Sequence, residues 1–285
     1  MRLDDFDPNS VNIGDQRGSK FSMGGAGGKV GCGGIVVAII AALVFGVDPA
    51  QMLGTMQGAD GSGQVATEGG KTATESCTVD ALSRETCNAL SSLNQTWQPL
   101  FEQARIAFTP PRLVFYSQDG QSGCGAAQSA MGPFYCPSDQ GIYIDTDFYR
   151  EMETKLGASG DFARAYVIAH EYGHHIHTVL GVSNEVRGAQ SSNPSAANRL
   201  QVAMELQADC YAGVWAARNR DKIEPGDIEE GLTAAHSIGD DVLTGGRAPE
   251  SAFTHGSAAQ RMEWLRKGLE TGDEDQCDTF AAFRR

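Results

Sequence analysis

The sequence has no CxxC or CxxH spacing among its seven cysteines, although such pairs are typical of zinc fingers and thioredoxin-like redox sites. It also has no basic patch: 22 basic residues stand against 36 acidic ones, for a formal charge of −14. A chain this acidic is repelled by nucleic acid. Internal repeats are absent as well. These absences argue against a redox protein, a zinc finger and a nucleic-acid partner.

Long hydrophobic runs are scarce, and one stands out. The stretch from Val30 to Val47 carries no charge and ends at Asp48 and Pro49. Its length is near the lower limit for a helix that spans a bilayer. A cleaved signal peptide is an alternative, but the leader contains four aspartates, unlike a signal-peptide n-region. A buried core helix is the other alternative, and the glycine-rich flanks disfavour it. We therefore predict one transmembrane helix over residues 30–47.

The flanking charges predict how this helix is oriented. Three basic residues precede it closely, and only Lys71 follows it within a similar distance. Positive charge stays inside, so the N-terminus is expected in the cytoplasm and the rest at the periplasmic or extracellular face of the cell membrane. Residues 1–29 are polar and glycine-rich, which favours a flexible cytoplasmic tail, and 48–76 favour a linker. The folded domain is then expected over 77–285.

The cysteines agree with an exported domain. Cys32 lies in the hydrophobic run, which leaves six others in the predicted domain. In an oxidising compartment these six would form three disulfides, whereas in the cytosol they would be thiols. Pairing nearest neighbours in sequence predicts Cys77–Cys87, Cys124–Cys136 and Cys210–Cys277.

The predicted domain is mainly helical with a small sheet, an α+β class. Hydrophobic residues at helical spacing predict a helix over 80–108, which Pro110 ends. Arg112–Tyr116 and Gly141–Asp145 are typical of strands, separated by a Gly/Ser-rich loop. Beyond Asp161 the pattern is mostly helical.

One predicted helix, over 161–181, carries an HExxH motif, with Asp161 as its expected N-cap and Gly181 as its stop. Residues four apart share a helix face, so His170 and His174 can bind one Zn²⁺. Glu171 is then placed to take a proton from a zinc-bound water.

A third ligand must come from another helix. His175 points away from His174, and His177 lies about 10.5 Å along the axis from His170. Glu205 and Asp209 stand four apart on an otherwise apolar helix over 195–218, where two inward carboxylates need a cation or donor. We predict Glu205 as the third ligand and Asp209 as the acceptor for the free N–H of a ligating histidine.

HExxH followed by ExxAD resembles the gluzincin pattern. More narrowly, the chain resembles the YpfJ-type neutral zinc metallopeptidase family of bacteria, in stretches between Gly132 and Asp273: GPFYCPSDQGIYID, AHEYGHHIH, MELQADCYAGVWA, IGDD and FTHGSAAQRMEWLRKGLETGD. The resemblance implies a zincin-like fold, a Zn²⁺ cofactor and peptidase activity.

The resemblance also implies how substrate would bind. Gluzincin-like sites take peptide as an added strand, and residues 141–145 are the candidate edge. The transition state needs a donor besides zinc, for which His255 is the first candidate. The alternatives are His236, Tyr172 and Tyr143.

Two functions follow from these observations. The first is a membrane-anchored zinc endopeptidase that hydrolyses peptide bonds with Glu171 as general base. The alternative is a non-catalytic, zinc-stapled binding module at the outer face of the membrane. Glu171 favours the peptidase, because a structural zinc needs no general base and usually has four protein ligands. The sequence indicates no oligomeric state.

Overall fold

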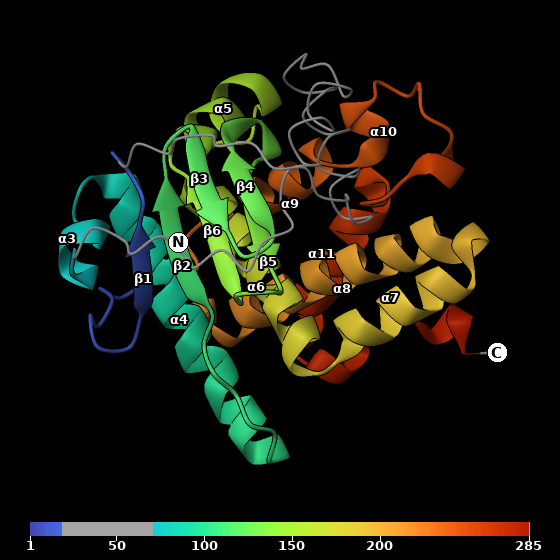
Figure 1. Cartoon of the computed structure of the whole chain (residues 1–285), viewed down its shortest axis with the longest axis horizontal. Helices are drawn as coiled ribbons and strands as arrows, with labels where there is room; N and C mark the ends of the chain where they lie inside the picture. Colours follow the sequence, from blue (N-terminus) through green and yellow to red (C-terminus); the bar gives the residue numbers. More distant parts are fainter. Residues whose placement is uncertain (19–70, 285) are drawn as a thin grey trace.

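A computed structural model describes residues 1–18 and 71–284 (Figure 1). The helices in this part of the chain are α3 (Ala73–Cys77), α4 (Ala81–Ala104), α5 (Asp147–Leu156), α6 (Asp161–Val179), α7 (Val182–Ser192), α8 (Ala197–Arg218), α9 (Asp227–Ser237), α10 (Asp240–Leu243) and α11 (Ala258–Thr271). The strands are β1 (Asn12–Asp15), β2 (Arg112–Tyr116), β3 (Asp119–Ser122), β4 (Gly125–Gln128), β5 (Phe134–Cys136) and β6 (Gly141–Asp145).

The main sheet has the strand order β1-β2-β6-β5. The first three strands in this order are parallel, and β5 pairs antiparallel with β6. Strands β3 and β4 form a separate antiparallel hairpin. β6 therefore lies inside the sheet, and the expectation that residues 141–145 form an exposed edge is wrong. The edge on that side is β5, because β6 already uses both of its sides for pairing.

The helices stand beside the sheet, with α6 in contact with α4, α8 and α9 (Figure 1). α8 and α11 approach each other most closely through glycines. A Cβ on Gly268 would lie 2.0 Å from the carbonyl oxygen of Cys210, and one on Gly213 would lie 2.3 Å from that of Leu265. Only glycine allows the two backbones this close. The fold thus brings α8, which carries Glu205 and Asp209, against both α6 and α11.

The predicted elements are largely confirmed. The two predicted strands coincide with β2 and β6, and the mainly helical fold with a small sheet is present. The helix expected over 80–108 ends at Ala104, because Arg105 adopts a left-handed conformation with φ of 60°. Gly181, with φ of 80°, ends α6 as expected. Asp161 is the first helical residue and Gly160 is the N-cap, so the expected cap is off by one.

All three predicted disulfides are present. They join Cys77 to Cys87, Cys124 to Cys136 and Cys210 to Cys277. The third ties the helix that carries Asp209 to the chain beyond α11. It closes a loop of 67 residues, for which loop-closure entropy alone gives a stabilisation of about 4 kcal/mol.

The expectation of a flexible tail over residues 1–29 is wrong for residues 1–18. Asn12–Asp15 form strand β1, which pairs in parallel with β2. Val11 is buried in the same hydrophobic core as Trp97 of α4. The sequence did not predict this strand because its residues, NIGD, show no clear alternation, so its conformation is set by pairing with β2.

The transmembrane helix expected over residues 30–47, and most of the linker over 48–76, lie outside the described residues. Within residues 1–18 and 71–284, no helix is both long enough and hydrophobic enough to cross a bilayer.

Candidate metal centre

Two facing helices bring three potential metal ligands together. His170 and His174 lie one turn apart on α6, and Glu205 lies on α8. Ligand atoms of all three are within 4.8 Å of one another. The Glu205 carboxylate oxygen Oε2 is 3.1 Å from His170 Nε2 and 3.6 Å from His174 Nε2. The structure thus assembles the ligand set that the sequence predicts.

These donors fit a zinc ion. Two atoms each about 2.0–2.2 Å from a tetrahedral ion lie about 3.3–3.6 Å apart, close to the spacing seen here. The protonation pattern points the same way. His170 Nδ1 lies 2.8 Å from Asp209 Oδ1, and because a carboxylate only accepts, Nδ1 carries the proton. In neutral His170 the Nε2 lone pair then faces the Glu205 carboxylate, an arrangement that calls for a cation between them.

The pKa values of His170 and Glu205 also indicate a site for a positive charge. Although burial lowers the pKa of His170, the carboxylates of Asp209 and Glu205 outweigh it and raise the pKa to about 9. Burial likewise favours neutral Glu205, but the two histidines hold its pKa well below the usual range. In the absence of metal a proton is retained where a metal ion would bind. Both carboxylates are positioned for a positive charge.

Asp209 takes the supporting place predicted for it, and it is completely buried. Arg261 of α11 grips both of its oxygens, with Nε and Nη2 each donating at 2.9 Å. The Tyr166 hydroxyl donates to Asp209 Oδ1 at 2.6 Å. Burial would raise the pKa of Asp209, but Arg261 and His170 lower it, so Asp209 is ionised. Three donors therefore fix the carboxylate that orients His170.

Sequence reasoning missed Arg261 and Tyr166. Arg261 lies in the first turn of an amphipathic helix, where arginine is usually solvated, yet its side chain is only 2% exposed. The usable signal was Asp209 itself, since a buried carboxylate needs more than one neutral histidine as a partner. Tyr166 precedes His170 by one helical turn and so faces the same partner helix.

Glu171 lies beside the ligands on α6 and is 9% exposed. Burial is the largest influence on this carboxylate and raises its pKa, against the opposing effect of His170 and His174. A raised pKa suits a group that takes and returns a proton near neutral pH.

Gly173, inside the motif, sets the distance between α6 and α8. A Cβ there would lie 2.8 Å from Ala208 Cα, closer than real Cβ contacts occur. The glycine and the alanine together let the helices approach until Glu205 reaches the histidines. The second variable position of the HExxH motif, Gly173, is therefore restricted to glycine in this protein.

Neither neighbouring histidine belongs to the ligand cluster, as expected. His175 is fully buried between β5 and the loop before β2, accepting from the Tyr135 hydroxyl at Nδ1 and donating from Nε2 to the Thr109 carbonyl. Burial lowers its pKa to about 4. His177 is also fully buried, and burial lowers its pKa to about 3.

The four candidate transition-state donors differ in their hydrogen-bond partners and in their positions relative to the metal ligands. His255 Nδ1 faces Asp240 Oδ1 at 3.2 Å, and the positive charge of His255 contributes to lowering the pKa of Glu205, after burial and the two ligand histidines. Tyr172 donates to Asn94, away from the ligands. Tyr143 donates to Asp139. His236 is exposed at the end of α9. Of the four candidates, His255 is the one that is among the main influences on the pKa of Glu205.

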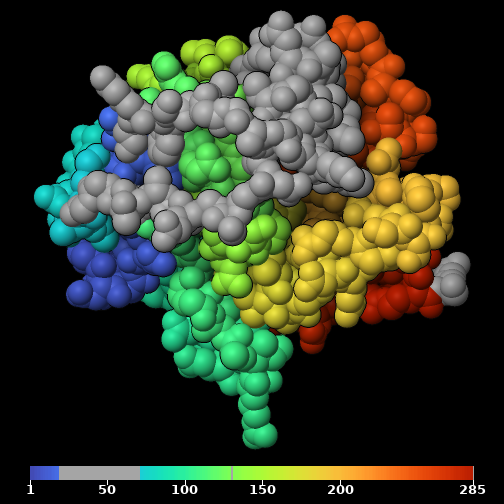
Figure 2. Space-filling view, in the orientation of Figure 1, coloured from blue at the N-terminus to red at the C-terminus, as the bar shows by residue number. Residues whose placement is uncertain are grey.

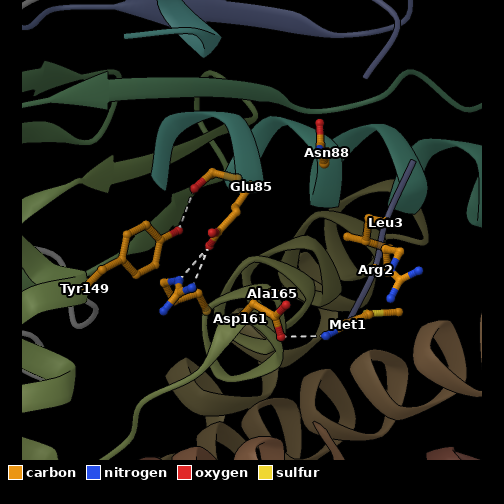
Figure 3. A pocket seen from close by; sticks show the side chains of 10 residues that line it. Met1, Arg2, Leu3, Glu85, Asn88, Tyr149, Asp161 and Ala165 are labelled. Carbon is orange, nitrogen blue, oxygen red and sulfur yellow. Dashed lines mark hydrogen bonds and ion pairs between the residues drawn. The ribbon is translucent and has the colours of Figure 1, made fainter. Parts of the chain in front are cut away.

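A pocket of about 170 Å³ lies elsewhere, at the start of α6 (Figure 3). Glu85, Tyr149, Asp161 and Arg164 are among the residues that line it, and none of the ligands does. Glu85 pairs with Arg164 across it at 2.7 Å. Asp161 also accepts an ion pair from the amino group of Met1, which further contacts Asp227. This pocket is separate from the metal centre.

The described residues define a mixed helix-and-sheet domain with a metal centre of two histidines and one glutamate on facing helices. The chain belongs to the family described as "Putative neutral zinc metallopeptidase", which residues 4–280 match. The family implies zinc and, at that level, a metallopeptidase. The resemblance noted from the motifs is therefore confirmed, and it covers nearly the whole chain.

Similar proteins occur in distant bacteria. The chain is 43% identical over 281 residues to Uncharacterized protein YpfJ of Escherichia coli (strain K12), covering 95% of this chain and 96% of that one. It is 43% identical over 209 residues to Uncharacterized protein Rv2575 of Mycobacterium tuberculosis (strain H37Rv), covering 67% and 68%. Uncharacterized protein Mb2605 of Mycobacterium bovis matches to the same extent. No solved structure matches.

Proposed function

We propose that this protein is a zinc-dependent peptidase of zincin-like arrangement that hydrolyses peptide bonds, with Glu171 as general base. The convergence of His170, His174 and Glu205 beside Glu171 carries the proposal. Three protein ligands leave a fourth position for water, the arrangement of catalytic zinc sites rather than structural ones. This disfavours the alternative, a zinc-stapled binding module.

Zinc, when bound, polarises the scissile carbonyl and lowers the pKa of a bound water to about 7. Glu171 accepts the proton of the attacking water and later delivers it to the leaving amine. Its burial supports the first step, because a carboxylate with a raised pKa takes up a proton more readily near neutral pH and holds it until the amine leaves. Asp209 holds the tautomer of His170 throughout.

His255 is the proposed donor to the developing oxyanion. Asp240 Oδ2 accepts the backbone N–H groups of Thr254, His255 and Gly256, which fixes the loop that carries the imidazole. Asp240 Oδ1 lies 3.2 Å from His255 Nδ1 and fixes the orientation of the ring. Protonated His255 would then donate from Nε2 toward the substrate.

The substrate would add a strand beside β5, which lies at the end of the described sheet. It would not add beside β6, which lies inside the sheet. The hydrogen bond between Tyr135 and His175 joins β5 to α6. A peptide paired with β5 would therefore lie at a fixed position relative to the metal ligands on α6. The disulfide Cys124–Cys136 holds the end of the same strand.

Three disulfides support a location in an oxidising compartment, outside the cytoplasm. We propose residues 77–285 as the body of the peptidase domain, with membrane attachment through residues 30–47.

The test uses the full chain, because residues 1–18 pack into the domain. Glu171→Gln removes the general base and leaves all three ligands, so zinc content should stay at the wild-type level. Hydrolysis of an unfolded protein such as casein should fall by about 10²–10⁴-fold. Glu185→Gln, exposed on α7, is the matched control and should retain full activity.

Two other results would change the conclusion. If the wild type and Glu171→Gln both bind zinc and neither hydrolyses any substrate, the binding module becomes the better account. If neither binds zinc, the assignment of the metal centre is wrong.

A further inference from the structure

Residues 1–18 pack beside α3 and α4 and along one side of β2 (Figure 2). Leu3, Phe6 and Ile13 pack against the core that contains Leu90 and Trp97 of α4. In Figure 2 these first residues lie directly against the helices that follow residue 71. These contacts are apolar, so removal of the segment would expose part of the core to water.

Charged and polar groups lock the same segment in place. The Asp15 carboxylate is 1% exposed and pairs with Arg17 and Lys71, at 2.8 Å and 3.0 Å. Arg17 also donates to Ser83 Oγ and to the carbonyl of Ser76. These partners lie before and within the start of α4. A buried carboxylate with two cations of its own indicates a built interface rather than a passing contact.

One chain of hydrogen bonds runs from this segment into the catalytic motif. The Ser10 carbonyl accepts from Asn94 Nδ2 at 3.0 Å, and Asn94 Oδ1 accepts from the Tyr172 hydroxyl at 2.9 Å. Tyr172 is fully buried and stands between Glu171 and Gly173. Asn94 is 4% exposed with the segment in place, so both hydrogen bonds lie in the protein interior.

These hydrogen bonds fix which way the Asn94 side-chain amide points. With Ser10 in place, the NH₂ group of Asn94 is directed at Ser10 and its oxygen at Tyr172. Without Ser10, a buried amide donor loses its partner, and the amide gains by turning its NH₂ group elsewhere. Tyr172 would then lose its acceptor. The present hydrogen bond from Tyr172 of α6 to Asn94 of α4, at the residue that follows the general base, would be lost.

We propose that residues 1–18 are a working part of the catalytic unit, and that Ser10 and Asn94 position the HExxH helix through Tyr172. The proposal rests on the proposed peptidase function for its kinetic consequence. Its structural consequence, the order of α6, does not depend on that function.

The first test is Tyr172→Phe in the full chain, which removes one hydroxyl and keeps the ring. Tyr149→Phe is the matched control, because Tyr149 is also buried and its hydroxyl shares one hydrogen bond with Thr86 of α4, away from the motif. Tyr172→Phe should lower kcat roughly tenfold with KM and zinc content unchanged. Tyr149→Phe should leave kcat within about twofold of wild type.

The second test releases the segment. Val11→Asp places a charge in the core, and Asn9→Asp places the same charge two residues away at an exposed position. Hydrogen exchange is measured on the metal-free full-length proteins. Val11→Asp should speed exchange of α6 amides around Tyr172, and its kcat should match that of Tyr172→Phe. A variant with both Val11→Asp and Tyr172→Phe should have a kcat little lower than either single variant, because both changes break the same series of hydrogen bonds from Ser10 to Tyr172.

The outcomes separate cleanly. The proposal is overturned if Val11→Asp frees β1 while α6 exchange stays at the wild-type rate, or if Tyr172→Phe behaves like Tyr149→Phe. If Val11→Asp does not fold, the comparison of the two tyrosine variants still decides. If no protein, wild type included, hydrolyses peptide, the peptidase function fails, and α6 exchange alone tests the positioning.

Discussion

Arg261 and Asp209 form a buried ion pair directly behind His170. Arg261→Met leaves the buried Asp209 carboxylate with only His170 and the Tyr166 hydroxyl as donors, so the free energy of unfolding should fall by about 3–5 kcal/mol. Zinc affinity should fall by about 10–100-fold, because the group that orients a ligating histidine is disturbed. Arg261→Lys should restore little, since lysine cannot grip both oxygens.

The control for this prediction is Arg218→Met, which breaks a half-exposed pair with Glu274 and should cost about 0–1 kcal/mol. Urea unfolding and competitive zinc titration give the two quantities. Equal effects of the two methionine variants would mean that the buried pair does not support the metal centre.

The same residues show what sequence alone could and could not give. Glu205 and Asp209 were predictable, because carboxylates on an apolar helix need an explanation. Arg261 was not, since no local pattern marks an arginine that reaches back to a helix about fifty residues earlier. Substrate-facing choices among His255, Tyr172 and Tyr143 also needed the fold, because each depends on which partner the side chain finds.

At the scale of elements, the separation of α6 and α8 is set by Gly173. Gly173→Ala should raise intrinsic helix propensity by about 1 kcal/mol, yet its Cβ would meet Ala208 Cα at 2.8 Å. We expect the clash to win: the helices move apart, zinc affinity falls, and thermal stability drops. Gly188→Ala on α7 is the control, because nothing lies within 4 Å of its Cβ, and it should stabilise.

Ala208→Gly added to Gly173→Ala removes the Ala208 Cβ at 2.9 Å but leaves its Cα at 2.8 Å, so it should recover only part of the zinc affinity. Calorimetric unfolding and zinc titration test both steps. If Gly173→Ala stabilises the protein as Gly188→Ala does, without loss of zinc, the contact between α6 and α8 is not what places Glu205.

Elements with strong local signals were predictable, and those made by pairing were not. β2, β6 and α6 carry their own hydrophobic patterns, and their bounds were close to correct. β1 has four residues and no alternation, so it is a strand only because β2 offers a free side. The place of β6 inside the sheet likewise follows from β5, which the sequence showed only as part of a loop.

At the scale of the whole molecule, the described contacts and the charge pattern make opposite predictions. The flanking charges predict that residues 30–47 cross the membrane once, with the N-terminus inside. One crossing would place residue 18 and residue 71 on opposite sides. Yet Lys71 and Asp15 form an ion pair at 3.0 Å, and β1 pairs with β2 along its length. Both arrangements cannot hold in one folded chain.

We expect the contacts to hold. Breaking them would leave the buried Asp15 carboxylate without Lys71 and would expose part of the hydrophobic core to water. Single cysteines at Asn9 and Ser191, both exposed, test this in a Cys32→Ser background. A membrane-impermeant thiol reagent applied to intact spheroplasts should label both positions or neither, since they belong to one folded body. Labelling at Ser191→Cys with protection at Asn9→Cys would show that the chain crosses once. Residues 1–18 would then be absent from the peptidase domain, and the catalytic motif would have to keep its order without Ser10.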